Sequence, residues 1–151
     1  MDAKKALDRA AAYCSRQERC VYDVKRKLES WEVAPDKFGA IIERLINEKF
    51  IDERRYAAFY ARDKFRFNSW GKIKIRWSLK QKDLPEDAIQ KALSEINEKE
   101  YRAKLHSLLS NKLKQLKNKK DNYQIKASLI RFGQSKGYET DLIYSILDQL
   151  I

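Results

Sequence analysis

The chain has 151 residues, of which 43% are hydrophobic and 36% are charged, and it contains only four glycines and two prolines. This composition predicts an ordered, all-α protein, because disordered chains carry fewer apolar residues and turn-rich β folds need more glycine and proline. A net charge of +11 indicates a polyanionic partner. Nucleic acid is the leading candidate, although an anionic membrane or an acidic protein would satisfy the same sign.

Three amphipathic helices are predicted in the first fifty residues, because apolar residues recur there every three or four positions. The first helix covers residues 4–14, and the second begins near Val21 and ends near Trp31. A short connection leads to Pro35, which suits a first helical turn, and a third helix follows. The apolar residues of the three helices include Ala6, Leu7, Ala10, Ala11, Cys14, Val24, Leu28, Phe38, Ile41, Ile42, Leu45 and Ile46.

The next helical segment begins at Asp52, whose carboxylate can cap a helix over residues 53–67. A turn at residues 68–71 precedes the stretch KIKIRW, in which apolar and basic residues alternate as they do in a strand. A comparison with the rest of the chain favours a helix instead, because this stretch is one copy of an internal repeat. A further helix is predicted over residues 98–116.

The repeat is defined by three apolar anchors, Val33, Leu84 and Tyr138, which are 51 and 54 residues apart. Apolar residues recur nine positions before each anchor and five and nine positions after it. These residues are Val24, Ile75 and Leu129; Phe38, Ile89 and Ile143; and Ile42, Leu93 and Leu147. Leu28 and Leu79 also match five positions before the anchor, whereas the third copy offers Phe132 six positions before it, as if one residue were inserted.

We therefore predict three tandem three-helix repeats, at residues 1–50, 51–97 and 98–151, stacked as an elongated and curved array. Chance similarity among amphipathic helices is the alternative explanation of the spacing.

Positive charge is concentrated in two blocks. Residues 54–82 contain ten basic residues and one acidic residue, and residues 99–126 contain nine and two, whereas residues 1–53 contain eleven of each. A merely solvated face would mix both signs, so the first block predicts a binding surface. Its candidate binding residues are Arg62, Lys64, Arg66, Lys72, Lys74, Arg76, Lys80 and Lys82. The second block is weaker evidence, because cations also favour a helix C-terminus; it comprises Lys112, Lys114, Lys117, Lys119 and Lys120.

Aromatic residues are interleaved with the first block. Tyr56, Phe59 and Tyr60 recur at helical spacing, which predicts packing. Phe67 and Trp70 lie near a turn and either cap the core or stack on bases or on a partner. Trp77 alternates with apolar residues, so the sequence does not predict whether its side chain faces the core or the solvent.

No catalytic or metal-binding centre is predicted. His106 is the only histidine and has no recognisable nucleophile or metal-ligand partner, and no glycine-rich phosphate loop occurs. We therefore expect no enzymatic activity and no cofactor, and the lack of a metal-ligand cluster disfavours a nuclease. Cys14 and Cys20 fit no disulfide framework or CxxC pair, which predicts free thiols in a reducing cytoplasm. No apolar run reaches the ~18 residues of a membrane span, and residues 1–14 have no signal-peptide core.

Two spaced motifs carry a resemblance to a known family. They are Ile51-Asp52-Glu53-x-x-Tyr56-Ala57 and Gly71-x-x-x-Ile75-x-x-x-Leu79-x-x-Lys82, supported by Ser15-Arg16-Gln17-Glu18-Arg19 and Lys136-Gly137-Tyr138. In this order and spacing they resemble the RecX family over nearly the whole chain. Two departures affect helix ends: Asp83 replaces a glycine suited to a left-handed helix end, and Cys20 replaces a serine cap.

The resemblance implies tandem three-helix repeats and a non-enzymatic regulator of the RecA recombinase, active in DNA repair, homologous recombination and the SOS response. Such a regulator binds the RecA filament on DNA and inhibits ATP hydrolysis, strand exchange and filament growth. The implied partners are the RecA filament and single- or double-stranded DNA, with no membrane. From the distribution of charge we expect the middle repeat to make most of the DNA contacts, and we expect a monomeric, cytoplasmic protein. The alternative is a general helical DNA- or RNA-binding protein without a recombinase partner.

Overall fold

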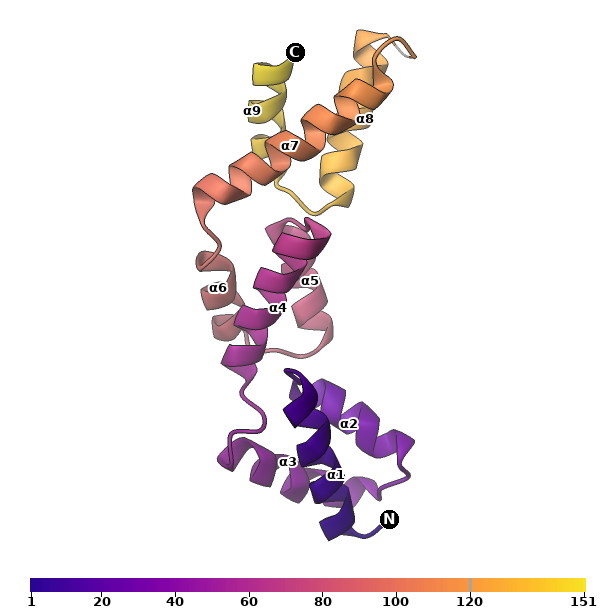
Figure 1. The fold of residues 1–151 in the computed structure, drawn as a ribbon, viewed down its shortest axis with the longest axis vertical. Coiled ribbons are helices and arrows are strands. Elements are labelled where there is room, and N and C mark those ends of the chain that lie inside the picture. Colours follow the sequence, from indigo (N-terminus) through magenta and orange to yellow (C-terminus); the bar gives the residue numbers. More distant parts are fainter. Residues whose placement is uncertain (120) are drawn as a thin grey trace. The chain divides into compact units, whose positions relative to one another are not determined.

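The structure, a computed structural model, describes residues 1–119 and 121–151, and all regular structure within them is helical (Figure 1). The helices are α1 (Ala3–Arg16), α2 (Val21–Ser30), the short 3-10 turn η1 (Pro35–Lys37), α3 (Phe38–Asn47), α4 (Glu53–Asn68), α5 (Lys72–Gln81), α6 (Glu86–Ser94), α7 (Glu98–Leu116), α8 (Asn122–Ser135) and α9 (Thr140–Leu150). The all-α prediction is confirmed, and the alternating KIKIRW stretch forms α5.

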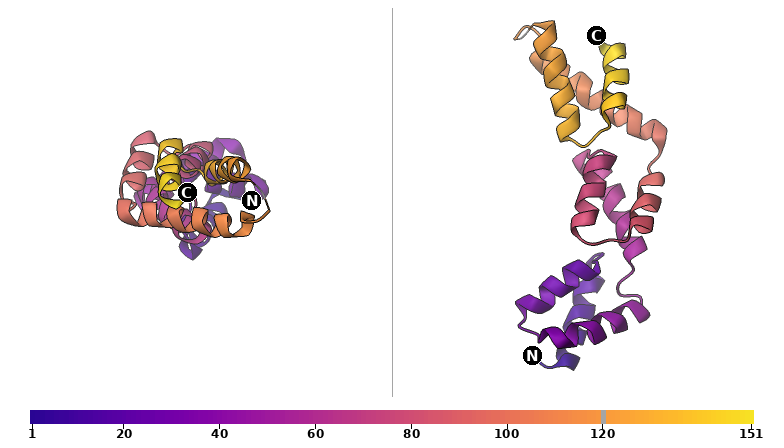
Figure 2. Two further views of the ribbon diagram at one scale, coloured as in Figure 1. Left: turned by 90° about the horizontal axis from the view of Figure 1, so that it is seen from above. Right: turned by 180° about the vertical axis from the view of Figure 1, so that it is seen from behind.

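The described chain packs as two compact units. Unit 1 comprises residues 1–60 and 79–92, and unit 2 comprises residues 61–78 and 93–151. In unit 1, helices α1, α2 and α3 contact one another, and in unit 2, helices α7, α8 and α9 do the same; both groups are visible from behind in Figure 2. Helices α4–α6 contribute residues to both units. The repeat boundaries at residues 50 and 97 stay a prediction.

One turn conformation recurs immediately before all three anchors of the repeat. Glu32, Asp83 and Gly137 have positive φ angles of 58°, 59° and 93°. In each case the next N–H reaches back five residues, which is the Schellman arrangement that ends a helix. The three bonds run from Val33 N to the Leu28 carbonyl (3.1 Å), from Leu84 N to the Leu79 carbonyl (3.3 Å) and from Tyr138 N to the Gly133 carbonyl (3.1 Å).

This turn corrects the alignment of the third repeat. Gly133, not Phe132, occupies the position five residues before the anchor, so no residue is inserted there. A Cβ atom at Gly133 would lie 2.7 Å from Cδ1 of Ile143, so the isoleucine side chain takes the space over the glycine. The apolar pattern missed this position because glycine has no side chain to count.

The repeat positions form the cores of the two units. Val24, Ile75 and Leu129, nine residues before the anchors, are fully buried. On α1 the buried face consists of Ala6, Ala10 and Cys14. Small residues on this face let α1 approach its neighbours closely, so the short N-terminal helices share one apolar core.

The helix starts follow the predicted capping chemistry. Oδ1 of Asp52 accepts the N–H groups of Arg54 at 3.1 Å and Arg55 at 3.0 Å, which confirms this cap of α4. At the start of α2, the N–H of Cys20 donates to Oδ2 of Asp23 at 3.2 Å. Asp23 therefore accepts the N–H of the capping residue, as the third residue of a capping box does, although the cap is cysteine instead of serine.

Candidate nucleic-acid interface

Most of the excess positive charge belongs to unit 2. Its residues include 17 basic and 8 acidic side chains, whereas unit 1 has 16 and 14. Both basic blocks contribute, because residues 61–78 and 99–126 fall in the same unit. Unit 2 is therefore the part of the chain in which a polyanion would find the largest charge imbalance.

Helix α4 carries three of the predicted binding residues in its C-terminal half. Arg62 and Arg66 are exposed and lie one helical turn apart, whereas Lys64 is half-buried. Residues four apart share one face of a helix. We call the pair Arg62 and Arg66 the α4 basic face.

Trp70 brings basic residues of α4 and α5 together. Nζ of Lys64 lies 5.4 Å from a Trp70 ring centroid, and Nζ of Lys74 lies 4.8 Å from it. Both distances fall within the roughly 6 Å reach of a cation–π interaction. Nζ of Lys74 also donates to the carbonyl of Ser135 at 3.4 Å. The half-buried indole is thus engaged with the protein's own lysines.

Lys72 belongs to a polar network inside unit 2. Its backbone N–H donates to the hydroxyl of Tyr101 at 2.9 Å, and its Nζ lies 3.2 Å from Oε2 of Glu98. The Tyr101 hydroxyl donates in turn to Oε1 of Glu139 at 2.6 Å. Burial is the main cause that raises the pKa of the Tyr101 phenol, and the hydrogen bond to Glu139 is the second. The phenol therefore stays protonated and keeps this donor role. Lys72 is therefore held in part by the fold.

Lys82 has a similar position in unit 1. Its Nζ donates to Oδ1 of Asp23 at 3.0 Å and to the hydroxyl of Tyr56 at 2.9 Å. Burial by itself would lower the pKa of Lys82, but the hydrogen bonds to Tyr56 and Asp23 outweigh it and raise the pKa, so the ammonium stays charged. The geometry gives Lys82 a structural role, and its predicted contact with a polyanion stays a prediction.

Helix α5 has two opposite apolar faces, which explains the alternation in its sequence. Ile75 and Leu79 are one turn apart and fully buried. Ile73 and Trp77 are also one turn apart, but their side chains are 54% and 63% exposed. Arg76 lies on the same side of the helix, three residues from Ile73. We call Ile73, Arg76 and Trp77 the α5 outer face.

The predicted site contained neither Ile73 nor Trp77, and it also left out Phe67, which is 81% exposed at the end of α4. The sequence did contain a signal for these two residues of α5. Ile73 and Trp77 are four positions apart but lie two positions before Ile75 and Leu79, so they fall on the side of the helix opposite the buried pair.

Of the three aromatic residues of α4 that were predicted to pack, Tyr56 is buried and Tyr60 is half-buried. Phe59 is 37% exposed, so the prediction was wrong for this residue.

The remaining predicted residues differ in their surroundings. Nζ of Lys80 lies 3.5 Å from Oε2 of Glu86 in an ion pair whose two side chains are both more than half exposed, so little energy holds it. In the second block, Nζ of Lys112 lies 5.3 Å from the Phe132 ring centroid. The exposed members of this block are Lys114, Lys117 and Lys119. Lys120 lies outside the described residues.

Two other kinds of site are absent from the described residues. Residues 1–119 and 121–151 contain no group of three or more His, Cys, Asp or Glu residues that could hold a metal ion. No described helix has the length and apolar character required to cross a bilayer. His106 is exposed on α7, and Cys14 and Cys20 are free thiols in the core of unit 1, as expected.

Two family models match the chain. The model of the second three-helix domain of RecX matches residues 52–93, and the model of the third three-helix domain matches residues 98–147. Together they cover more than half of the chain, including both basic blocks.

Individual relatives extend the match to the first repeat. The regulatory protein RecX of Clostridium botulinum (strain Eklund 17B / Type B) is 31% identical over 148 residues, which cover 97% of this chain and 69% of the relative. The regulatory protein RecX of Lactobacillus johnsonii (strain CNCM I-12250 / La1 / NCC 533) is 28% identical over 145 residues, covering 96% of this chain but only 53% of the relative. The crystal structure of RecX from Lactobacillus salivarius matches with a TM-score of 0.85 at 25% identity, covering 98% of this chain and 96% of that chain.

Proposed function

The chain belongs to the RecX family, and from this premise we propose that it is a non-enzymatic regulator of the RecA recombinase. It binds the RecA filament on DNA and inhibits ATP hydrolysis by RecA, strand exchange and filament growth. The name that the relatives share, regulatory protein RecX, supports the regulatory role.

The observation that carries the proposal is the charge imbalance of unit 2, with 17 basic and 8 acidic residues. Basic side chains that neutralise phosphates release condensed counterions, and this release favours binding to DNA. Exposed aromatic rings beside these charges, Phe67 and Trp77, add surfaces on which a base or a protein side chain can stack. The combination suits a partner that offers both phosphates and apolar groups, as a protein-coated DNA does.

We assign the contact mainly to six basic residues of α4 and α5 outside the Lys72 and Lys82 networks. These residues are Arg62, Lys64, Arg66, Lys74, Arg76 and Lys80. Lys114, Lys117 and Lys119 form a second contact. Lys72 and Lys82 contribute charge nearby, but their ammonium groups also hold the fold together.

Binding alone accounts for inhibition if the protein prefers one state of the filament. A ligand shifts a conformational equilibrium only by its difference in affinity for the two states. The protein therefore inhibits ATP hydrolysis by binding the inactive arrangement of the filament more tightly than the active one. No chemical step by the protein is required.

The test measures the DNA-dependent ATPase of RecA with single-stranded DNA in large excess over both proteins. Substoichiometric amounts of this protein are expected to suppress the ATPase. A general nucleic-acid-binding protein that only competes for DNA would leave the rate unchanged under these conditions, and that result would contradict the proposal.

Charge reversal on the α4 basic face locates the contact. The variant Arg62→Glu/Arg66→Glu should need at least about tenfold more protein for the same inhibition, since several phosphate contacts are lost or become repulsive. Lys25→Glu/Lys37→Glu is the matched control, because it changes the net charge equally at two exposed positions of unit 1. If both double variants lost inhibition to the same extent, net charge and not the α4 basic face would account for the contact with the filament.

A further inference from the structure

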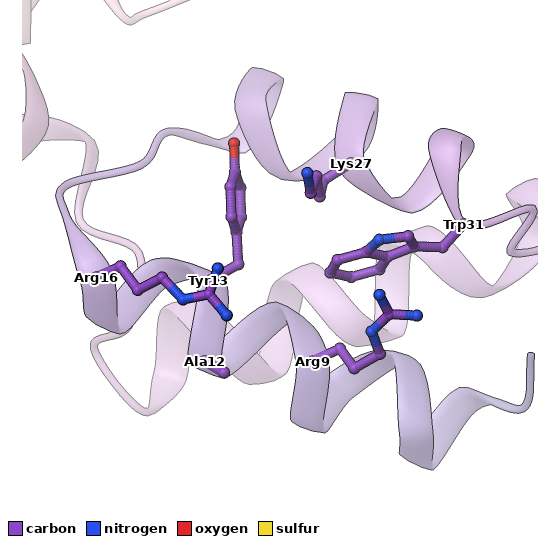
Figure 3. A pocket seen from close by; sticks show the side chains of 6 residues that line it. All are labelled: Arg9, Ala12, Tyr13, Arg16, Lys27 and Trp31. Carbon is purple, nitrogen blue, oxygen red and sulfur yellow. The ribbon is translucent and has the colours of Figure 1, made fainter.

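A cleft between α1 and α2 in unit 1 forms a second basic and aromatic site. It has a volume of about 200 Å³ and is lined by Arg9, Ala12, Tyr13, Arg16, Lys27 and Trp31. Figure 3 shows the Tyr13 ring rising from α1 and the Trp31 indole extending toward it from α2, with the Arg9 guanidinium against the indole. The two aromatic side chains thus share one cleft with three cations.

The helical period places these residues together. Arg9, Tyr13 and Arg16 recur every three or four positions on α1, and Lys27 on α2 lies one turn before Trp31, the residue that caps the C-terminus of this helix. The adjacent faces of both helices are buried in the core of unit 1, and Tyr13 and Trp31 pack partly against that core. The cleft is therefore built on two helices whose orientation the core determines, and not on a loop.

The lining of the cleft contains cations and no carboxylate. Within the described part of the chain, none of Arg9, Arg16 and Lys27 forms an ion pair with an acidic residue. Arg19 does not line the cleft, but it places a further cation near it, because its guanidinium carbon lies 3.9 Å from the Tyr13 ring centroid. Residues 1–53 have no net charge. The fold nevertheless places several of their cations together at this cleft, which the net charge of the segment does not reveal.

The aromatic rings narrow the chemistry of the ligand. Nζ of Lys27 lies 5.3 Å from the Tyr13 ring centroid and 5.9 Å from a Trp31 ring centroid, so one cation serves both rings. A group that combines a negative charge with a flat ring would match this arrangement, with phosphate on the cations and the ring against tyrosine or tryptophan. An acidic peptide would satisfy the cations, which themselves contact the two rings, but it offers no flat group for the aromatic side chains.

The size of the cleft favours one unit of a polymer over a free small molecule as its ligand. Pockets that enclose a whole small molecule measure roughly 300–1,000 Å³, and this cleft measures about 200 Å³. It therefore suits a single nucleotide unit whose neighbours continue outside. A single strand offers an unstacked base directly, whereas a duplex must first unpair and unstack the base at an energetic cost.

We propose that the cleft between α1 and α2 binds one nucleotide of single-stranded DNA, with phosphate on Arg9, Arg16 and Lys27 and the base against Tyr13 or Trp31. The site is separate from the α4 basic face and the α5 outer face. It rests on the proposed function only in taking DNA as a partner, and it needs no contact with a recombinase.

The experiment measures binding of the full chain to a fluorescent oligothymidylate in the absence of RecA, over a range of salt concentrations. Arg16→Ala/Lys27→Ala should weaken binding about tenfold and reduce the log–log salt slope by about 1.4, the value for two phosphate contacts on a single strand. Lys25→Ala/Lys37→Ala removes two cations outside the cleft and should change neither quantity by as much. Circular dichroism of each variant shows whether it is folded.

Two further arms test the contribution of the base, and the second of them locates the base without any mutation. An abasic strand of equal length should bind more weakly than oligothymidylate, and Trp31→Phe, which keeps a packed ring, should reduce this difference. Photocrosslinking with a 5-iodouracil oligonucleotide should mark the peptides that contain Tyr13 or Trp31.

The outcomes separate this inference from the proposed function. Crosslinks confined to α4 and α5, together with normal binding by Arg16→Ala/Lys27→Ala, would overturn the inference and leave the regulator proposal intact. Cleft-dependent binding of an acidic peptide in place of DNA would also overturn it, as would a full chain that binds no single strand. Cleft-dependent DNA binding without any effect on the RecA ATPase would support the inference and count against the proposed function.

Discussion

The backbones of Gly71 and Gly137 pack directly against each other in unit 2. The N–H of Gly71 donates to the Lys136 carbonyl at 2.7 Å, and the Gly137 carbonyl accepts from Ile73 N at 3.0 Å. A Cβ atom at Gly71 would overlap the Gly137 carbonyl and lie 2.6 Å from Tyr138 N. The start of α5 and the turn after α8 are therefore joined by main-chain bonds that exclude side chains from both sides.

Gly71→Ala should consequently destabilise the protein. The added methyl group meets backbone and not a flexible side chain, so the two segments must separate, and we expect a loss of about 2–4 kcal/mol in the free energy of unfolding. Urea denaturation followed by circular dichroism measures this change. Gly39→Ala is the control, because nothing lies within 4 Å of a Cβ at this helical position; there alanine should be neutral or stabilising by up to about 1 kcal/mol. Equal stability of both variants would contradict the close packing.

Lys82→Ala should act on stability more than on binding. It leaves the carboxylate of Asp23, which is 14% exposed, and the hydroxyl of Tyr56 without their ammonium partner. Because the site is only partly exposed, we expect a loss of about 1–3 kcal/mol in the free energy of unfolding. Lys80→Ala removes a lysine from an exposed ion pair and should cost about 0–1 kcal/mol. A stable Lys82→Ala protein with strongly weakened filament inhibition would instead establish Lys82 as a contact residue.

These residues show what a sequence can and cannot predict here. The helices and the repeat were predictable, because burial of one apolar face imposes a period that is visible in the residues themselves. The structural role of Lys82 was not, since its partner Asp23 lies 59 positions away in the chain and no local pattern connects the two. At Asp83 the sequence showed only that a glycine suited to a left-handed helix end is replaced, and it did not predict that aspartate keeps this conformation.

The candidate surfaces were predictable to different degrees. The basic block around α4 was visible because its charges are contiguous in the chain. The cleft of Tyr13 and Trp31 was not, because its cations alternate with acidic residues that the helices direct elsewhere. A segment's net charge carries no information about which face of a helix holds each charge.

Stability should fall at alkaline pH. Burial raises the pKa of Cys14 from 9.0 to about 11 and that of Cys20 from 9.0 to about 12. Folding thus favours the neutral thiols, so their contribution to stability is complete below about pH 9 and is lost as the pH rises through 11 and 12. The raised pKa values of Tyr56 and Lys82 act in the same direction.

Urea denaturation at pH 7.5 and at pH 10.5 measures this loss, which we expect to be at least about 1–2 kcal/mol in the free energy of unfolding. Cys14→Ala removes one of the titrating thiols, so the stability of this variant should depend less steeply on pH. A free energy of unfolding that is the same at both values would show that the thiols are accessible to water.

The α5 outer face should contribute to binding without contributing to the fold. Trp77 is 63% exposed, so Trp77→Ser should change the free energy of unfolding by no more than about 0.5 kcal/mol. If the indole stacks on a base or on a RecA side chain, its loss should weaken filament binding by about 1–3 kcal/mol, which is roughly 5- to 150-fold. Inhibition of the RecA ATPase as a function of protein concentration measures this change.

The salt dependence separates this contribution from that of the charges. Trp77→Ser removes no cation, so the slope of log affinity against log salt should stay that of the parent protein, whereas Arg62→Glu/Arg66→Glu should flatten it. Tyr144→Ser is the matched control, since it removes a 45% exposed aromatic ring from α9 and should leave both affinity and slope unchanged. If Trp77→Ser and Tyr144→Ser inhibited equally well, the exposed indole of α5 would be excluded from the contact, and binding would depend on the basic residues alone.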